Sequence, residues 1–143
     1  MGTRTPVKPS ALKSGDLLGI VAPASGIKPE MLSAGIRELE SLGFKTRLRE
    51  DINTTEWYLA GNLERRLDEF REMLLDDQVR GIICARGGYG SGHLLPHLKS
   101  QEIAENLKVF CGASDVTMLL TAFACANVVA FYGPMVATTI RQG

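Results

Sequence analysis

Residues 108–116 read KVFCGASDV, and within them a strand-like run changes into a helix. Lys108 to Cys111 have the apolar pattern of a buried strand, and a long apolar helical stretch starts at Val116. A serine at such a corner can project its hydroxyl from the sheet edge, while the next amides point outward at the helix N-terminus. Ser114 is therefore a candidate nucleophile. The alternative is that Ser114 caps the helix, because serine accepts hydrogen bonds from free N–H groups there.

Strand-like and helical segments alternate along the rest of the chain, which is typical of parallel α/β units. Gly43 is placed to end the first helix and Asn62 to cap the second. The sequence predicts an α/β fold of three layers, a mostly parallel sheet of the flavodoxin or Rossmann type flanked by helices. The expected strands are 17–22, 44–48, 81–85, 108–111 and 128–131, and the expected helices are 29–42, 63–75, 94–98, 101–106 and 116–126.

Length and composition restrict the class of protein. The 143 residues fit one domain, residues 1–143, and 16 basic side chains balance 16 acidic ones, so neither nucleic acid nor a membrane surface is expected as a partner. No apolar run approaches the roughly 20 residues of a membrane span, and residues 1–13 lack an apolar signal core. We expect a cytoplasmic protein. Cys84, Cys111 and Cys125 form no CxxC pair and are expected to be buried without a metal.

A glycine-rich loop, RGGYGSG at residues 86–92, follows the third expected strand. Ligands of α/β proteins bind at the carboxyl edge of the sheet, so Arg86, Gly87 and Tyr89 are expected to line the site. The loop could cradle a phosphate, but its spacing is not GxGxxG and no GxxxxGK[ST] occurs. It could also be a flexible turn without a ligand. In the third interpretation, one of its amides and the amide of Asp115 form an oxyanion hole above Ser114.

A nucleophilic serine needs a general base, and the chain has only two histidines, His93 and His97. No carboxylate is placed to orient either ring, so both are expected to be surface or packing residues, with His93 as the alternative base. Val116 also stands where a GxSxG elbow has its second glycine. The residues alone describe half of an active site.

Five motifs, taken together and in this order, resemble the LD-carboxypeptidases. These are serine peptidases of the muramoyltetrapeptide carboxypeptidase type, related also to the microcin C immunity peptidases. The resemblance covers nearly the whole chain. Its motifs are LGIVAPAS at 18–25, YLAG at 58–61 followed by Arg65 and Arg66, ARGGYGSGHLLP at 85–96, GASDVT at 112–117 and GPM at 133–135.

The resemblance implies roles for particular residues. Ser114 would be the nucleophile, and the oxyanion hole would be the amide of Asp115 with that of Gly88, or of Gly87 as the competing assignment. Such enzymes cut the L,D bond before the terminal D-alanine of a peptidoglycan stem peptide. They need no metal or cofactor, and the typical member works in the bacterial cytoplasm during wall recycling. The implied partner is a murein peptide substrate.

The chain also departs from the family pattern. The family takes the glutamate and histidine of its triad from a second, C-terminal domain, and a typical member is about twice as long. We therefore expect a nucleophile-bearing N-terminal domain whose C-terminal domain is absent, and an isolated chain with little or no activity. Three positions also differ from the residues common in the family. Ala113 stands where an aromatic residue is common, His93 where arginine is common, and Tyr132 where histidine is common.

Two further expectations follow. The absence of the C-terminal domain should expose apolar surface that was an interface, which favours a homodimer or a domain-swapped oligomer that exchanges Val128 to Thr139.

The rival functions are a small-molecule or nucleotide-binding module that uses the glycine loop, a microcin-type peptide hydrolase, and a complete small esterase that uses His93.

Overall fold

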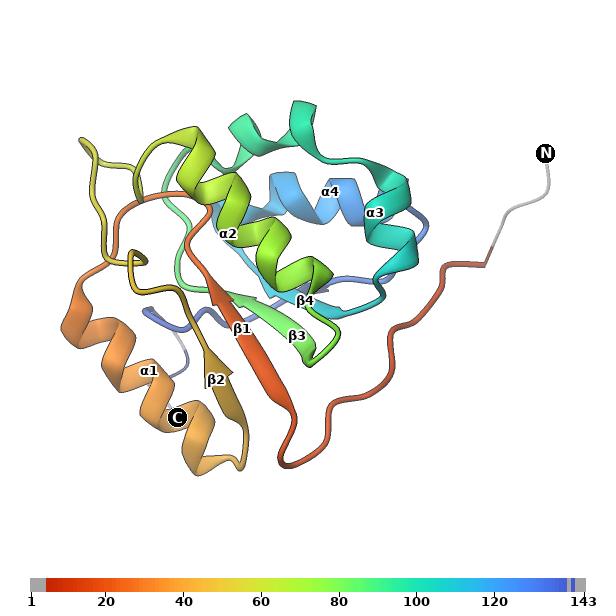
Figure 1. Cartoon of the computed structure of the whole chain (residues 1–143), viewed down its shortest axis with the longest axis horizontal. Coiled ribbons are helices and arrows are strands. Elements are labelled where there is room, and N and C mark those ends of the chain that lie inside the picture. Colours follow the sequence, from red (N-terminus) through yellow and green to blue (C-terminus); the bar gives the residue numbers. More distant parts are fainter. Residues whose placement is uncertain (1–4, 139, 141–143) are drawn as a thin grey trace.

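The computed structural model describes residues 5–138 and 140, and within them five strands form one parallel sheet in the order β2-β1-β3-β4-β5 (Figure 1). This is the strand order of flavodoxin-like folds. The predicted α/β fold is confirmed. The strands are β1 Leu17–Val21, β2 Lys45–Arg47, β3 Val79–Cys84, β4 Val109–Gly112 and β5 Phe131–Tyr132; the α-helices are α1 Pro29–Ser41, α2 Leu63–Leu75, α3 Ser100–Glu105 and α4 Thr117–Cys125; the 3-10 helices are η1 Ser91–His97 and η2 Ser114–Val116.

Two local predictions of helix ends are confirmed. The side chain of Asn62 accepts a hydrogen bond from Arg65 N at 2.8 Å and so caps α2. Gly43 follows α1 with a φ of 92°, a conformation that glycine adopts without the steric cost of a Cβ.

Two predicted elements are wrong in place or type. The last strand is Phe131–Tyr132 instead of 128–131, because Val128 pairs with the N-terminal segment, where Val7 N donates to Asn127 O at 2.8 Å. The expected helix 94–98 begins at Ser91 and is a 3-10 helix. Thr139, at the end of the segment expected to exchange, lies outside the described residues.

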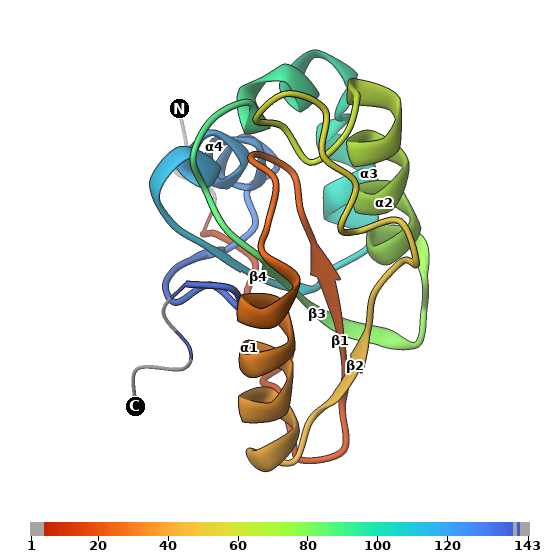
Figure 2. The same ribbon diagram turned by 90° about the vertical axis from the view of Figure 1, so that its left-hand side faces the viewer.

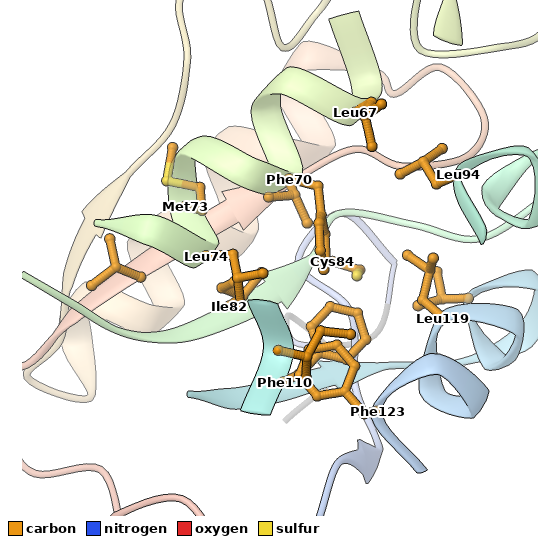
Figure 3. Close-up of a cluster of buried hydrophobic side chains, with 14 of the residues drawn as sticks. Leu67, Phe70, Met73, Leu74, Ile82, Cys84, Leu94, Phe110, Leu119 and Phe123 are labelled. Atoms are coloured by element: carbon orange, nitrogen blue, oxygen red, sulfur yellow. The ribbon is translucent and has the colours of Figure 1, made fainter. Parts of the chain in front are cut away.

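One face of the sheet is covered by helices. The helices α2, α3, α4 and η1 pack on it, and Figure 2 shows α2 and α3 on the side opposite α1. Phe110 of β4 and Phe123 of α4 stack with ring centroids 4.4 Å apart, and the ring of Phe70 meets both edge to face (Figure 3). All three rings are fully buried. Aromatic packing of this kind adds to the stability gained from burial alone.

The other face is covered over only part of its width. Leu32 and Leu39 of α1 pack with Leu18 and Ile20 of β1. The segment after β5 runs beside α1 so closely that a Cβ on Gly35 would overlap the carbonyl oxygen of Val136. Beyond this contact lies an apolar groove of about 350 Å³, the open groove, which is lined by Leu12, Ile83, Val109, Cys111, Phe131, Tyr132, Gly133 and Pro134.

The three cysteines do not share one environment. Cys84 is buried, and desolvation raises the pKa of its thiol, whereas Cys111 is half-buried. Cys125 is exposed, so the expectation that it is buried was wrong. Helix α4 packs through Leu119 and Phe123, one turn apart, and a residue two positions after Phe123 falls on the outer side.

No helix among residues 5–138 and 140 is long and apolar enough to cross a membrane.

Candidate active site

Ser114 is exposed and follows β4 after one intervening residue, Ala113. Its φ is 58°, in the left-handed region that only two other non-glycine residues of the described chain adopt, Trp57 and Asn127. This conformation costs roughly 1–2 kcal/mol for a residue with a Cβ. A strained, exposed serine between a strand and a helix is the geometry of a nucleophile elbow.

Ser114 does not cap the helix that follows it. The N-cap position of α4 is Val116, that of η2 is Ala113, and neither helix start has a side-chain cap hydrogen bond. An N-cap residue normally has extended backbone angles, and Ser114 has a positive φ instead. The capping interpretation of Ser114 is therefore wrong, and its hydroxyl is left free for another role.

The glycine loop lies against Ser114. A Cβ on Gly87 would stand 3.2 Å from Ser114 Oγ and 3.2 Å from Asp115 N. Any side chain at Gly87 would therefore fill the space in front of both groups. Gly88 has a φ of 104°, and a Cβ there would overlap Ser25 Oγ. Close approach at Gly87 and a positive φ at Gly88 explain why this loop needs glycine at both positions.

Ser25 connects the loop after β1 to the glycine loop. Its Oγ accepts a hydrogen bond from Tyr89 N at 3.1 Å, and its N donates to Gly87 O at 3.2 Å. In this strand order, ligands bind where the loops after β1 and β3 diverge. The residues predicted for the site therefore meet at the position that the topology favours for a ligand.

Ser91 holds Asp115 through two hydrogen bonds. Ser91 N donates to Asp115 Oδ2 at 2.8 Å, and Ser91 Oγ donates to Asp115 O at 2.7 Å. Ser91 is fully buried. The residue that follows Ser114 is thus fixed to the end of the glycine loop. The sequence contains no signal for this role of Ser91, since its partner is 24 residues away and no local pattern connects the two.

Arg66 of α2 connects the loop after β1 to the glycine loop after β3. Its side chain is 1% exposed, and its Nη1 donates to Pro23 O at 2.9 Å and to Gly90 O at 2.7 Å. Desolvation lowers the pKa of this guanidinium. Because a buried cation is costly unless its donors are satisfied, these contacts fix the relative position of the loops after β1 and β3.

Arg65 and Glu69, one turn apart on α2, form a buried ion pair. Glu69 Oε2 accepts from Ala22 N at 2.7 Å, and Glu69 Oε1 accepts from Arg65 Nη2 at 2.5 Å. Burial raises the pKa of Glu69 to about 7. Sequence reasoning missed Glu69. The signal was present in α2, where charged residues share the buried side of the helix with Leu67 and Phe70.

The remaining predicted residues lie around this centre. Within the described chain His93 faces Arg66, with Nδ1 3.4 Å from Arg66 Nη2, and meets the ring of Tyr89 edge to face; no contact with Ser114 is found. Arg86 donates from Nη1 to Gly26 O at 3.1 Å, and Tyr89 is 54% exposed. The structure thus brings the glycine loop to Ser114 and does not bring His93 there.

The family is decided by a match over residues 18–133 to the model described as the LD-carboxypeptidase N-terminal domain. The chain belongs to the LD-carboxypeptidase family. It is 39% identical over 134 residues to a probable murein peptide carboxypeptidase of Bacillus subtilis, covering 93% of this chain and 42% of that protein. It is 34% identical over 119 residues to the murein tetrapeptide carboxypeptidase of Pseudomonas aeruginosa, covering 82% of this chain and 39% of that protein.

Solved structures agree with the family assignment. The wild-type microcin C7 self-immunity protein MccF without ligand superposes with a TM-score of 0.90 at 27% identity, over 96% of this chain and 42% of that one. The muramoyltetrapeptide carboxypeptidase from Oxalobacter formigenes superposes with a TM-score of 0.81 at 28% identity, over 89% of this chain and 43% of that one. The chain spans about two fifths of the length of the relatives it matches.

Proposed function

We propose that this domain supplies the nucleophile and the oxyanion hole of a serine-type LD-carboxypeptidase that removes the terminal D-alanine from a murein tetrapeptide. One observation carries the proposal: an exposed Ser114 in a left-handed conformation, with Gly87 beside its Oγ and beside the amide of Asp115. The family supports carboxypeptidase chemistry.

In the proposed reaction, Ser114 Oγ attacks the carbonyl carbon that precedes D-alanine and gives its proton to a general base. The oxyanion of the tetrahedral intermediate accepts hydrogen bonds from the amides of Asp115 and Gly88, with Gly87 as the competing donor. The base then protonates the nitrogen of D-alanine, which leaves, and the peptide remains as an ester of Ser114. Water hydrolyses this ester and restores the serine.

The general base is proposed to come from outside this chain. Ser114 Oγ has no hydrogen-bond partner among the described residues, and His93 faces Arg66 instead. A glutamate and a histidine from a C-terminal domain would complete the triad. Losing a triad partner costs several orders of magnitude in rate, so the isolated chain is expected to be nearly inactive. The proposed setting is peptidoglycan recycling in the bacterial cytoplasm.

The test is release of D-alanine from L-Ala-γ-D-Glu-mDAP-D-Ala, followed by mass spectrometry. This chain is compared with a longer protein that carries a C-terminal domain, each with and without Ser114→Ala. We expect cleavage by the longer protein alone and its loss in Ser114→Ala. Ser33→Ala, at an exposed serine on α1, is the matched control and should cut normally. Cleavage that survives Ser114→Ala would exclude Ser114 as the nucleophile.

A second candidate is a microcin-type peptide hydrolase, which the similarity to MccF favours. The same proteins are offered an aminoacyl-nucleotide amide in place of the murein peptide. Cleavage of this compound alone would replace the first candidate by the second. A nucleotide-binding module, in contrast, would show thermal stabilisation by ATP or NAD that does not depend on Ser114.

A further inference from the structure

A small basic pocket lies at the same sheet edge as Ser114, on the side of α1. It has a volume of about 230 Å³, and we call it the basic pocket; it is lined by Lys28, Met31, Arg86, Ala137 and Thr138. Two of these residues are cationic and none is acidic. The pocket thus has the charge of an anion site and room for a small anionic group.

Arg86 has no carboxylate partner within the described residues. Its Nη1 donates to Gly26 O at 3.1 Å, which fixes the guanidinium, and no ion pair involves it. Arg47, Arg49, Arg65 and Arg71 pair with carboxylates. The buried Arg66 has no carboxylate partner in the described chain either, but carbonyl oxygens accept from its Nε and its Nη1. A half-buried arginine held by one carbonyl keeps the rest of its donors for a ligand, and its planar fork suits a carboxylate.

Thr138 gives a second, independent indication of a ligand. Its Oγ1 is buried and has no hydrogen-bond partner among the described residues. Buried hydroxyls are nearly always hydrogen-bonded, so an unpartnered one on the wall of a basic pocket calls for an acceptor that enters the pocket. Lys28, the N-cap residue of α1, adds a positive charge, and the helix start adds its dipole.

The position of the pocket relates it to the nucleophile. Arg86 immediately precedes Gly87, whose added Cβ would stand 3.2 Å from Ser114 Oγ, and Arg86 Nη2 lies 3.7 Å from the place of a Cβ on Gly88. In a carboxypeptidase substrate the terminal carboxylate is one residue beyond the scissile bond, roughly 3.5 Å along an extended chain. The group that binds it must therefore come from the immediate surroundings of the nucleophile, and Arg86 precedes the glycine that contacts Ser114.

We propose that the basic pocket, through Arg86, Lys28 and the hydroxyl of Thr138, binds the α-carboxylate of the last residue of the peptide. This assignment rests on the proposed function. It explains in physical terms how the site would select the end of a chain: a peptide that continues past the cleaved bond brings a neutral amide into a pocket that holds two positive charges.

The test uses the isolated domain and N-acetyl-D-alanine, with N-acetyl-D-alanine amide as the uncharged analogue. Amide chemical shifts are followed by ¹H–¹⁵N NMR during titration of the ¹⁵N-labelled chain. We expect saturable shifts at Arg86 and Ala137 with the acid and at least about tenfold weaker binding of the amide. Arg86→Gln and Lys28→Gln should each weaken binding of the acid, with Arg86→Gln the larger effect. Arg37→Gln, at an exposed arginine of α1 outside the pocket, is the matched control.

Equal binding of the acid and the amide, or unchanged binding in Arg86→Gln, would overturn the assignment. So would saturable shifts with inorganic phosphate alone. Failure of the assignment and failure of the proposed function remain distinguishable. If the longer protein cuts the murein peptide and Arg86→Gln leaves its KM unchanged, only the assignment fails. If the acid binds in the basic pocket and the longer protein cuts nothing, only the proposed function fails.

Discussion

The two faces of the sheet are built differently. On the side of α2 and α4, stacked aromatic rings and a buried arginine network fill the space up to the loops of the candidate site. On the side of α1, packing stops before β4 and β5, and the open groove leaves Phe131 45% exposed and Tyr132 71% exposed. The covered face fixes the position of Ser114, because α4, η1 and Arg66 all belong to it. Stability and site geometry should therefore depend on one face far more than on the other.

Truncating one phenylalanine on each face tests most directly whether stability depends more on the covered face. Phe123→Ala should lower the free energy of unfolding by about 3–5 kcal/mol, because it empties a fully buried, stacked position. Phe131→Ala removes a ring that is 45% exposed and should cost less than about 1 kcal/mol. Urea unfolding followed by circular dichroism measures both. Equal losses would mean that the open groove is packed in solution.

Arg66→Met tests whether the polar contacts on the covered face also contribute to the free energy of unfolding. The change leaves Pro23 O and Gly90 O without their donor and should lower the free energy of unfolding by about 2–4 kcal/mol. The control, Arg37→Met, alters an exposed arginine and should stay within about 0.5 kcal/mol of the wild type. Unfolding in urea compares the two variants. A mild effect at Arg66 would show that water replaces its contacts.

The buried carboxyl of Glu69 gives the covered face a pH dependence. Its folded-state pKa is raised from an ordinary 4.5 to about 7, so in this interval the folded protein retains a proton that the unfolded chain has lost. The contribution of this proton to the free energy of unfolding is therefore fully present below pH 4.5 and is lost as the pH rises through about 7. Glu69→Gln should flatten this part of the stability profile, whereas Glu72→Gln, at an exposed site on the same helix, should not. Parallel profiles for the wild type and Glu69→Gln would contradict the assignment.

Ser114 tests the strain at the edge where the two faces meet. Glycine tolerates a φ of 58°, and alanine does not. Ser114→Gly should therefore be more stable than Ser114→Ala by up to about 1 kcal/mol, measured as the difference in urea midpoints at equal m-value. An alanine variant that matches or exceeds the glycine variant would show that the left-handed conformation costs nothing here.

The open groove should affect association while changing stability least. A homodimer or swapped oligomer remains a prediction, and an apolar groove beside an edge strand is a surface through which it could form. We expect light scattering to show a mass that rises with concentration, and Tyr132→Ser to reduce this rise at unchanged thermal stability. A constant monomer mass in the wild type would exclude the groove as a self-association surface.

Local sequence signals predicted the elements well and the contacts between them poorly. Asn62 and Gly43 were identified because caps depend on a few neighbouring residues. The last strand was misplaced because Val128 bonds to the N-terminal segment, more than 100 residues away in sequence. The site shows the same division. The corner at Ser114 could be predicted, but the bonds from Ser91 and Arg66 that hold it depend on tertiary structure.

The contact between Gly35 and Val136 has a consequence for synthesis on the ribosome. The helix that carries Gly35 is made early, yet its packing surface includes a segment whose amides donate to Cys84 O and Ala85 O at 3.1 and 2.8 Å. At roughly 5–20 residues per second, the hundred residues between Gly35 and Val136 take about 5–20 s to translate. Throughout that interval the nascent α1 lacks part of its docking partner. The chain therefore completes this side of the domain only after residue 136 has left the exit tunnel.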